Sequence, residues 1–238
     1  MGGENRHASD LNEDTCHYRT ESRVPENVIV RKDTNVSFLD LCLFAFDLLI
    51  SRLRHFSEPS CPASIPDTDD YALFVTWNKK GREGERAQLR GCIGTLSPLN
   101  LRKGIHTYTL ASAFRDKRFR PISIEELENL SVSVSILYDF TTTRDVYDWQ
   151  VGVHGIIIDF CDKGETYSAT YLPEVCVEQG WTKEECISSL IRKSGYRNVI
   201  TENLLKSIRL TRYSSKKYSL SYSEYLRHRN KVFLDSRL

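Results

Sequence analysis

Apolar side chains occupy almost every position from Phe38 to Leu53, and this pattern predicts a helix that is buried on nearly all sides. Ser37 and Asp40 have the spacing of a capping pair at its first turn. The apolar run contains Asp40 and Asp47, and it is shorter than the about 20 nearly uncharged residues of a membrane-spanning helix. We therefore expect an interior helix and no membrane association.

Shorter stretches alternate apolar residues with small or polar ones, which is the pattern of strands. A charged segment separates the first two stretches, so we expect a turn there and an antiparallel pair. The last two stretches are interpreted as a hairpin that turns at residues 214–217. The predicted strands cover residues 71–77, 89–95, 131–138, 151–159, 166–172, 207–213 and 218–222.

Helices are predicted where a capping residue precedes an apolar pattern. After the first helix, the predicted starts are Ser97 or Asn100, the capping box of Ser123 and Glu126, the capping box of Thr182 and Glu185, and Ser221 with Glu224. These elements together predict an α+β fold, in which an antiparallel or mixed sheet forms a core flanked by helices. A chain of 238 residues with 40% hydrophobic content can bury the core of one compact unit or of two packed subdomains.

One predicted strand, with the sequence LRGCIGT at residues 89–95, carries an unusual set of side chains. Because alternate residues of a strand share a face, Arg90, Cys92 and Gly94 are predicted to lie on one surface. A guanidinium would then lie beside a thiol, and Gly94 would leave room for a ligand or another backbone. This strand is the first candidate site.

Two further segments supply candidate side chains. The loop at residues 115–121 combines four cations with Asp116 and Phe119, which predicts either an anion-binding loop or charge that only favours solubility. His154 lies in the predicted strand 151–159 with glycines nearby. It is therefore either a satisfied core residue or a ring that faces a pocket.

The overall charge does not attract polyanions, because 33 lysines and arginines face 32 acidic residues and the formal charge is +1. Nucleic-acid binding would need a local patch. From residue 204 onward, cations are interleaved with tyrosines, a pattern typical of proteins that bind single strands. The spacing of these cations and tyrosines favours instead the solvent-exposed face of a hairpin over a nucleic-acid site.

Seven cysteines without a C-x-x-C pair predict reduced thiols rather than a disulfide scaffold or a zinc site, and we expect no metal and no cofactor. The polar first residues lack the apolar stretch of a signal peptide, so we expect an intracellular protein, cytoplasmic and/or nuclear. Residues 1–34 are predicted to be a disordered tail, residues 35–226 the folded domain, and residues 227–238 a basic tail.

The LRGCIGT strand and several later segments resemble the AMMECR domain family. The resemblance covers about residues 35–226, and the later motifs look like the animal branch of the family. These motifs are Asp116 with Arg118, Phe119 and Pro121, GVHG at residues 152–155, TYLPEV at 170–175, EQGW at 178–181 and LTRY at 210–213. The resemblance implies an α+β fold of two unequal packed subdomains with a cleft beside the LRGCIGT strand, and it implies no established reaction.

Three functional hypotheses follow. The first is a regulatory binding or adaptor module whose cleft accepts a protein or peptide partner, or a small anionic ligand. The absence of a metal cluster, a nucleotide fingerprint or a recognisable triad in the sequence favours this hypothesis. Its candidate binding residues are Arg90, Gly91, Gly94, Thr95, Asp116, Arg118 and Phe119.

The second hypothesis is an enzyme in which Cys92 is a nucleophile or redox thiol, His154 is a general base, and Arg90 binds an anion or lowers the pKa of the thiol. The third hypothesis is nucleic-acid binding through the basic C-terminal region. The sequence leaves these three alternatives open.

Overall fold

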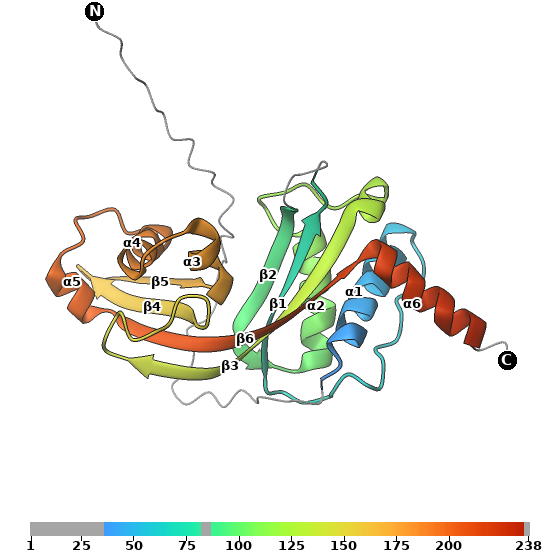
Figure 1. The fold of residues 1–238 in the computed structure, drawn as a ribbon, viewed down its shortest axis with the longest axis horizontal. Helices are drawn as coiled ribbons and strands as arrows, with labels where there is room; N and C mark the ends of the chain where they lie inside the picture. The colour runs from blue at the N-terminus through green and yellow to red at the C-terminus, as the bar shows by residue number, and fades with distance from the viewer. Residues whose placement is uncertain (1–35, 82–86, 236–238) are drawn as a thin grey trace, which may run out of the picture.

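Six strands form one antiparallel sheet, in the order β2-β1-β3-β6-β4-β5, and helices flank it (Figure 1). The computed structural model describes residues 36–81 and 87–235, so the predicted tail at residues 1–34 lies outside the described residues. The predicted α+β fold is confirmed. The strands are β1 Tyr71–Lys79, β2 Gln88–Leu99, β3 Leu130–Thr143, β4 Gly155–Asp162, β5 Glu165–Tyr171 and β6 Arg209–Ser221.

The helices begin where the sequence supplies capping groups. The side chains of Ser37, Asn100 and Thr182 each accept a hydrogen bond from a backbone N–H in the first turn, as predicted. The helical elements are α1 Phe38–Leu53, α2 Leu101–Phe114, the short 3-10 helix η1 Ile124–Asn129, α3 Pro173–Gln179, α4 Lys183–Lys193, α5 Glu202–Ser207 and α6 Tyr222–Asp235. No helix in the described part of the chain is long and apolar enough to cross a bilayer.

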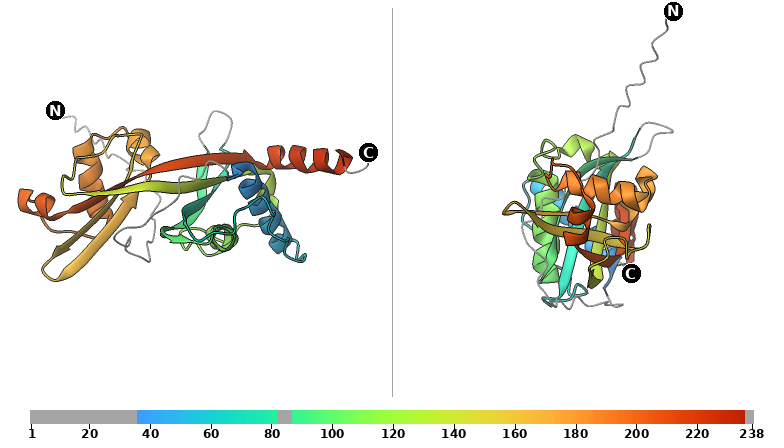
Figure 2. Two further views of the ribbon diagram at one scale, coloured as in Figure 1. Left: turned by 90° about the horizontal axis from the view of Figure 1, so that it is seen from below. Right: turned by 90° about the vertical axis from the view of Figure 1, so that its left-hand side faces the viewer.

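Two long strands, β3 and β6, run through the whole molecule and join two lobes (Figure 1). The larger lobe contains β1, β2, α1, α2, η1 and α6, and the smaller lobe contains β4, β5, α3, α4 and α5. The left view of Figure 2 shows α1 and α2, in blue and green, on one side of the long strands, and the orange helices α3 and α4 on the other. The two lobes therefore cover opposite faces of the sheet.

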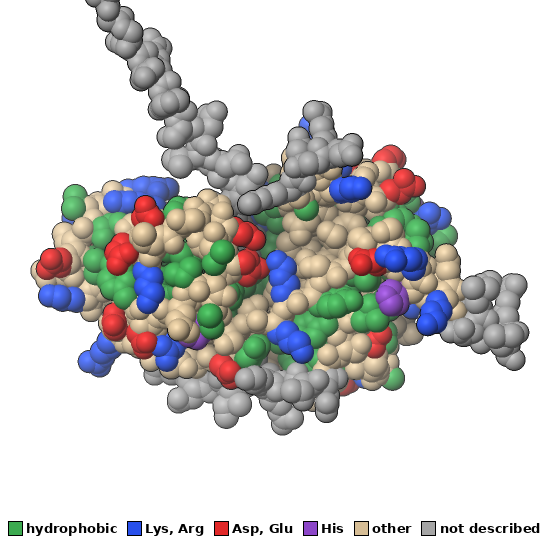
Figure 3. Space-filling model, viewed as in Figure 1, with side chains coloured by type: hydrophobic (Ala, Val, Ile, Leu, Met, Phe, Trp, Pro, Cys, Tyr) green, Lys and Arg blue, Asp and Glu red, His purple; other side chains and the backbone are tan. Residues whose placement is uncertain are grey.

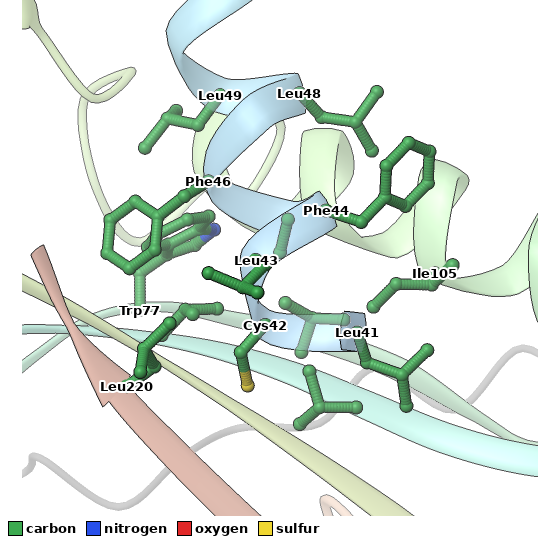
Figure 4. Close-up of a cluster of buried hydrophobic side chains, with 14 of the residues drawn as sticks. Leu41, Cys42, Leu43, Phe44, Phe46, Leu48, Leu49, Trp77, Ile105 and Leu220 are labelled. Atoms are coloured by element: carbon green, nitrogen blue, oxygen red, sulfur yellow. The ribbon is translucent and has the colours of Figure 1, made fainter. Parts of the chain in front are cut away.

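The core of the larger lobe forms between α1, α2 and one face of β1, β3 and β6. Leu41, Phe46 and Trp77 lie in this cluster, and the rings of Phe46 and Trp77 meet edge to face at 5.3 Å (Figure 4). α1 is apolar nearly all round because both the sheet and α2 contact it. Burial of these large side chains supplies the main stabilisation of the lobe.

The second core lies on the opposite face and belongs mostly to the smaller lobe. The isoleucines of β4 and the apolar face of α4 pack there, together with Phe74 and Cys92 from the larger lobe. Tyr213 of β6 is fully buried at the centre, where its hydroxyl donates to the carbonyl of Tyr171 at 3.0 Å. Its ring lies so close to Gly155 that a Cβ there would be 2.3 Å away, so this position requires glycine.

Several sequence predictions for individual elements were wrong. β6 is one continuous strand rather than a hairpin, because residues 214–217 pair with β3 instead of turning. β4 begins at Gly155, so the predicted strand at 151–159 starts four residues too early. α3 and α5 were not predicted. The predicted boundary at residues 226 and 227 falls within α6.

We predict that Tyr213→Phe lowers the free energy of unfolding by about 1–3 kcal/mol, because the buried carbonyl of Tyr171 and the hydroxyl of Thr170 lose a hydrogen-bond partner. Urea denaturation followed by circular dichroism measures this change. The matched control is Tyr218→Phe on the same strand, where the ring is exposed and little change is expected. Equal effects of the two substitutions would contradict the prediction.

Candidate functional site

The LRGCIGT strand lies at the edge of the sheet, where backbone groups need partners other than a neighbouring strand. The backbone N–H of Cys92 donates to Oδ2 of Asp116 at 2.9 Å, and Nη2 of Arg118 donates to the carbonyl of Cys92 at 3.2 Å. Asp116 and Arg118 are themselves paired, at 2.6 Å between Oδ2 and Nη2. At Cys92 the sheet edge is therefore already occupied by the loop after α2.

Arg90 is held in the same region by an acidic partner. Its Nε and Nη2 donate to the two carboxylate oxygens of Glu126, both at 2.9 Å, and Nη2 also reaches the carbonyl of Pro121 at 3.2 Å. The ring of Phe119 lies 6.0 Å from the Arg90 guanidinium carbon and 5.3 Å from that of Arg118. We call Arg90, Asp116, Arg118, Phe119 and Glu126 the β2 clamp.

Both carboxylates of the β2 clamp stay ionised. The bidentate hydrogen bond from Arg90 lowers the pKa of Glu126 to about 2. Burial raises the pKa of Asp116, but hydrogen bonds from Arg118 and from the backbone of Cys92 together outweigh it, so that this pKa lies below its ordinary value. The cations of the clamp are thus matched by charge within the protein.

Arg90 and Cys92 do not lie side by side as expected. The register between β1 and β2 shifts between Trp77 and Asn78, whose partners are Gly91 and Leu89, so Arg90 is an extra residue in its strand. Its guanidinium shares Glu126 with Lys79, on the side of the sheet that α1 and α2 cover. The thiol of Cys92 belongs instead to the core on the opposite face.

The thiol of Cys92 is nearly sealed from solvent. The residue is 2% exposed, and its sulfur lies 2.9 Å from the hydroxyl oxygen of Thr76 on β1. A buried thiol of this kind is ordinarily a small apolar residue with a weak hydrogen bond. This placement gives no support to Cys92 as a nucleophile.

The remaining predicted residues of the strand serve packing and turn formation. A Cβ at Gly91 would lie 2.1 Å from the carbonyl oxygen of Ser112 in α2, and one at Gly94 would lie 2.2 Å from that of Leu73 in β1. The hydroxyl of Thr95 accepts a hydrogen bond from the backbone N–H of Ser97 at 3.0 Å. The two glycines therefore permit close contact within the protein, not with a ligand.

His154 lies in the turn before β4 and closes that turn. Its Nδ1 accepts a hydrogen bond from the backbone N–H of Gln150 at 3.0 Å, and the backbone N–H of His154 donates to the carbonyl of Gln150. Burial, and after it the charge of Arg212, lowers the pKa of the imidazole, so the ring is neutral at pH 7 with its proton on Nε2. The Nδ1 lone pair, which a general base would use to accept a proton, is therefore already occupied by a hydrogen bond.

The structure does not bring Cys92 and His154 together along the shared strands. Cys92 pairs with Thr76, which pairs through Ser133 with Ser219 of β6, whereas Gly155 next to His154 pairs with Tyr213. Six residues of β6 separate these two positions, which corresponds to roughly 20 Å along the strand. The two residues proposed for an enzyme lie in different lobes.

Five cations of the basic C-terminal region lie within ion-pairing distance of carboxylates, four of them on other segments of the chain and one within α6. Arg209 pairs with Asp159, Arg212 with Asp148, Lys217 with Glu174, Arg227 with Glu224, and Arg229 with Asp47. Cations that bind phosphates are usually free to exchange counterions with the nucleic acid. This pairing weighs against the nucleic-acid hypothesis.

The described residues contain no obvious set of metal ligands. Among them, no three histidine, cysteine or acidic side chains converge on a position that could hold an ion. The described cysteines are all free: Cys42, Cys61, Cys92, Cys161, Cys176 and Cys186. The expected cleft beside the LRGCIGT strand stays a prediction.

Comparison with known proteins agrees with the geometry of the fold. The AMMECR1 family model matches residues 42–218. The chain belongs to the AMMECR1 family. An uncharacterized protein of Arabidopsis thaliana is 47% identical over 79% of this chain and 86% of its own length. An uncharacterized protein of Schizosaccharomyces pombe is 38% identical over 79% of this chain and 94% of its own length.

The AMMECR1 fold is also seen in a crystal structure. An uncharacterized protein from Pyrococcus horikoshii matches 76% of this chain and 90% of its own, with a TM-score of 0.62 and 25% identity. These relatives carry no established activity in their descriptions, so the family membership predicted from the LRGCIGT strand is confirmed without an activity attached. The assignment to an animal branch stays a prediction.

Glu126 is the site residue that sequence reasoning missed. The capping box of Ser123 and Glu126 was predicted and is present, with the Ser123 backbone N–H donating to Oε2 at 3.1 Å. The same carboxylate also binds Arg90, which lies 36 residues earlier. Because Glu126 follows the cationic loop at residues 115–121, the sequence indicated that its carboxylate could pair with a cation. It did not indicate that this cation is Arg90.

We predict that Glu126→Gln lowers the free energy of unfolding by about 1–3 kcal/mol at pH 7, because Arg90 loses its counter-charge. The folded pKa near 2 lies below the unfolded value near 4.5, so this stabilisation is complete above about pH 4.5 and disappears as the pH falls towards 2. Urea titrations between pH 7 and 3 should show the two proteins converging. The control Glu125→Gln, at the exposed neighbouring position, should change the free energy of unfolding little at pH 7. A difference between the wild type and Glu126→Gln that stayed constant at all pH values would contradict the prediction.

We also predict that iodoacetamide labels Cys92 at least about tenfold more slowly than Cys161 at pH 8, because Cys161 is exposed and Cys92 is buried. Peptide mass spectrometry of the intact, folded protein at timed intervals measures both rates. Comparable rates would show that the Cys92 thiol reaches solvent and would revive the enzyme hypothesis.

Proposed function

We propose that this protein is a binding or adaptor module that holds an apolar segment of a partner protein, rather than an enzyme. The observation that carries the proposal is a cluster of three exposed valines in the smaller lobe. Val151, Val153 and Val177 are 38%, 53% and 56% exposed. We call these three residues the valine surface.

Two segments that are distant in sequence form the valine surface. Val151 and Val153 flank Gly152 in the turn before β4, and a Cβ at Gly152 would lie 3.1 Å from Cγ2 of Val177 in α3. Gly152 has a φ of +77°, a conformation that glycine adopts without strain, and it presents both neighbouring valines. On the face shown in Figure 3, hydrophobic side chains reach the surface of the smaller lobe, on the left. Grouped exposed apolar residues are typical of protein contact sites.

A row of paired residues links the valine surface to the LRGCIGT strand. Nζ of Lys217 lies 2.9 Å from Oε1 of Glu174, so β6 is joined to α3, the helix of Val177. Across the sheet, Lys217 pairs with Ser135, Ser135 with Phe74, and Phe74 with Gly94. This row crosses three strand spacings, roughly 14 Å. Ser135 and Phe74 are themselves buried, so the row connects the valine surface to β2 through the interior of the protein.

The chemistry of the former catalytic candidates supports the same proposal. Cys92 is buried, the lone pair of His154 Nδ1 is used in a turn, and Arg90 is paired with Glu126. One nitrogen of Arg90, Nη1, is buried without an acceptor among the described residues, which leaves it able to bind a water molecule or a small anion. A binding role needs no further reactive group.

The test compares partner capture by variants of the full chain. We predict that Val177→Asp, alone or with Val153→Asp, weakens capture of the partners of the wild-type protein at least tenfold, because an aspartate would be buried in the complex without a partner. Cross-linking in cells followed by affinity purification and quantitative mass spectrometry gives the readout. Thermal stability should change little because these positions are exposed.

The matched control is Phe56→Asp, which removes another exposed hydrophobic side chain, just after α1 in the larger lobe. Cys92→Ser provides a second control, because a binding module should keep its partners without the thiol. Retention of all partners by Val177→Asp, or their loss from the Phe56→Asp variant alone, would contradict the proposal.

A further inference from the structure

An open pocket of about 620 Å³ lies at the end of the smaller lobe, away from the valine surface and the β2 clamp. The β4–β5 turn, the segment that follows α4, and α5 form its walls. Its volume falls within the range of small-molecule sites. The pocket does not depend on the proposed binding function.

The walls of this pocket are held in place by hydrogen bonds. Nη1 of Arg192 donates to the carbonyls of Tyr196 and Asn198, at 3.1 and 2.7 Å. The Asn198 amide donates in turn to the carboxylate of Asp162 in the β4–β5 turn, at 3.4 Å. The ring of Tyr196 packs edge-on against Tyr167, with the centroids 5.2 Å apart. The site is therefore formed before a ligand arrives.

The lining carries more hydrogen-bond donors than acceptors. Lys163 and Arg197 are its cations, and Asp162, its one carboxylate, already accepts from Asn198. Nη1 of Arg197 donates to the carbonyl of Arg192 at 3.2 Å, which leaves its other N–H groups for a ligand. Within residues 36–81 and 87–235, Lys163 has no hydrogen bond or ion pair. The surplus of positive charge favours an anion.

The lining also offers apolar contact beside these cations. Val199 is 77% exposed, and Leu204 of α5, which is mostly buried, also lines the pocket. A ligand that covered Val199 would remove apolar area from water while its charged group reached Lys163 or Arg197. From this combination we infer that the pocket binds a small molecule that joins an anionic group, carboxylate or phosphate, to an apolar body.

Cys161 provides a reporter for this site, because it is an exposed thiol in the pocket lining. The probe is phenyl phosphate, and the readout is the rate at which iodoacetamide labels Cys161 in the full chain, measured by peptide mass spectrometry at constant ionic strength. With a Kd near 1 mM, phenyl phosphate at about 10 mM should slow labelling roughly tenfold. Phenylacetate in place of phenyl phosphate shows which anionic group is preferred.

The double variant Lys163→Gln with Arg197→Gln should lose this protection. Lys206→Gln is the matched control, since it removes an exposed cation of α5 that does not line the pocket. Benzyl alcohol, which has a ring but no charge, should protect Cys161 little. The inference is overturned if neither anion protects Cys161, if the double variant is protected as well as the wild type, or if benzyl alcohol protects equally.

Discussion

The edge of the sheet at β2 leaves backbone groups that another strand could pair with, and at Cys92 the β2 clamp occupies them. An edge strand presents N–H and C=O groups that would otherwise pair with a second chain. Asp116 and Arg118 bond the N–H and the C=O of Cys92 and are paired with each other. The pairing of Arg90 with Glu126 ties the same strand to η1, which directly precedes β3. Residues that are far apart in sequence thereby fix the larger lobe.

This constraint explains why the LRGCIGT strand contains residues that suggest chemistry. Gly91 and Gly94 are required because α2 and β1 come so close to these positions that a Cβ atom would clash with their backbone. Arg90 is an irregular residue whose side chain reaches a carboxylate that is not in the sheet. An arginine, a thiol and two glycines in one strand resemble a reactive site, yet each of them has a role in packing or in closing the edge. A distinctive motif can therefore reflect architecture rather than catalysis.

The sequence was informative where structure depends on neighbours in the chain. The capping groups Ser37 and Thr182 and the capping box of Glu126 involve residues three positions apart, and all were predicted correctly. Residues 214–217 have the composition of a turn, but pairing with β3 extends them into a strand, and a local signal does not contain that partner. α3 begins at Pro173 after Leu172, which supplies no side-chain cap, so no capping residue marked its start, although proline also begins helices.

The same limit applied to the candidate site. Asp116, Arg118 and Phe119 were selected as a group, and the structure does place them together, because they belong to one loop. Arg90 and Cys92 were expected to share a face, and a single extra residue in β2 reversed that relation. Glu126 was recognised only as a cap, since its pairing with Arg90 depends on how α2 returns the chain to the sheet. Alternation alone does not reveal a bulge or a tertiary ion pair.

The two lobes cover opposite faces of one sheet, and they differ in how many of their charged and apolar side chains already have partners within the fold. In the larger lobe, the ionised groups of the β2 clamp satisfy one another, and the motif residues are mostly enclosed. In the smaller lobe, exposed valines remain at the surface, as does the ammonium group of Lys163, which has no partner among the residues that the structure describes. A group that already has its partner within the fold gains little from a ligand, whereas an exposed apolar or unpaired charged group gains free energy when it is covered. Recognition by this protein is therefore expected to depend on the smaller lobe, with the motif of the larger lobe holding β1, β3 and β6 in the positions from which that lobe is built.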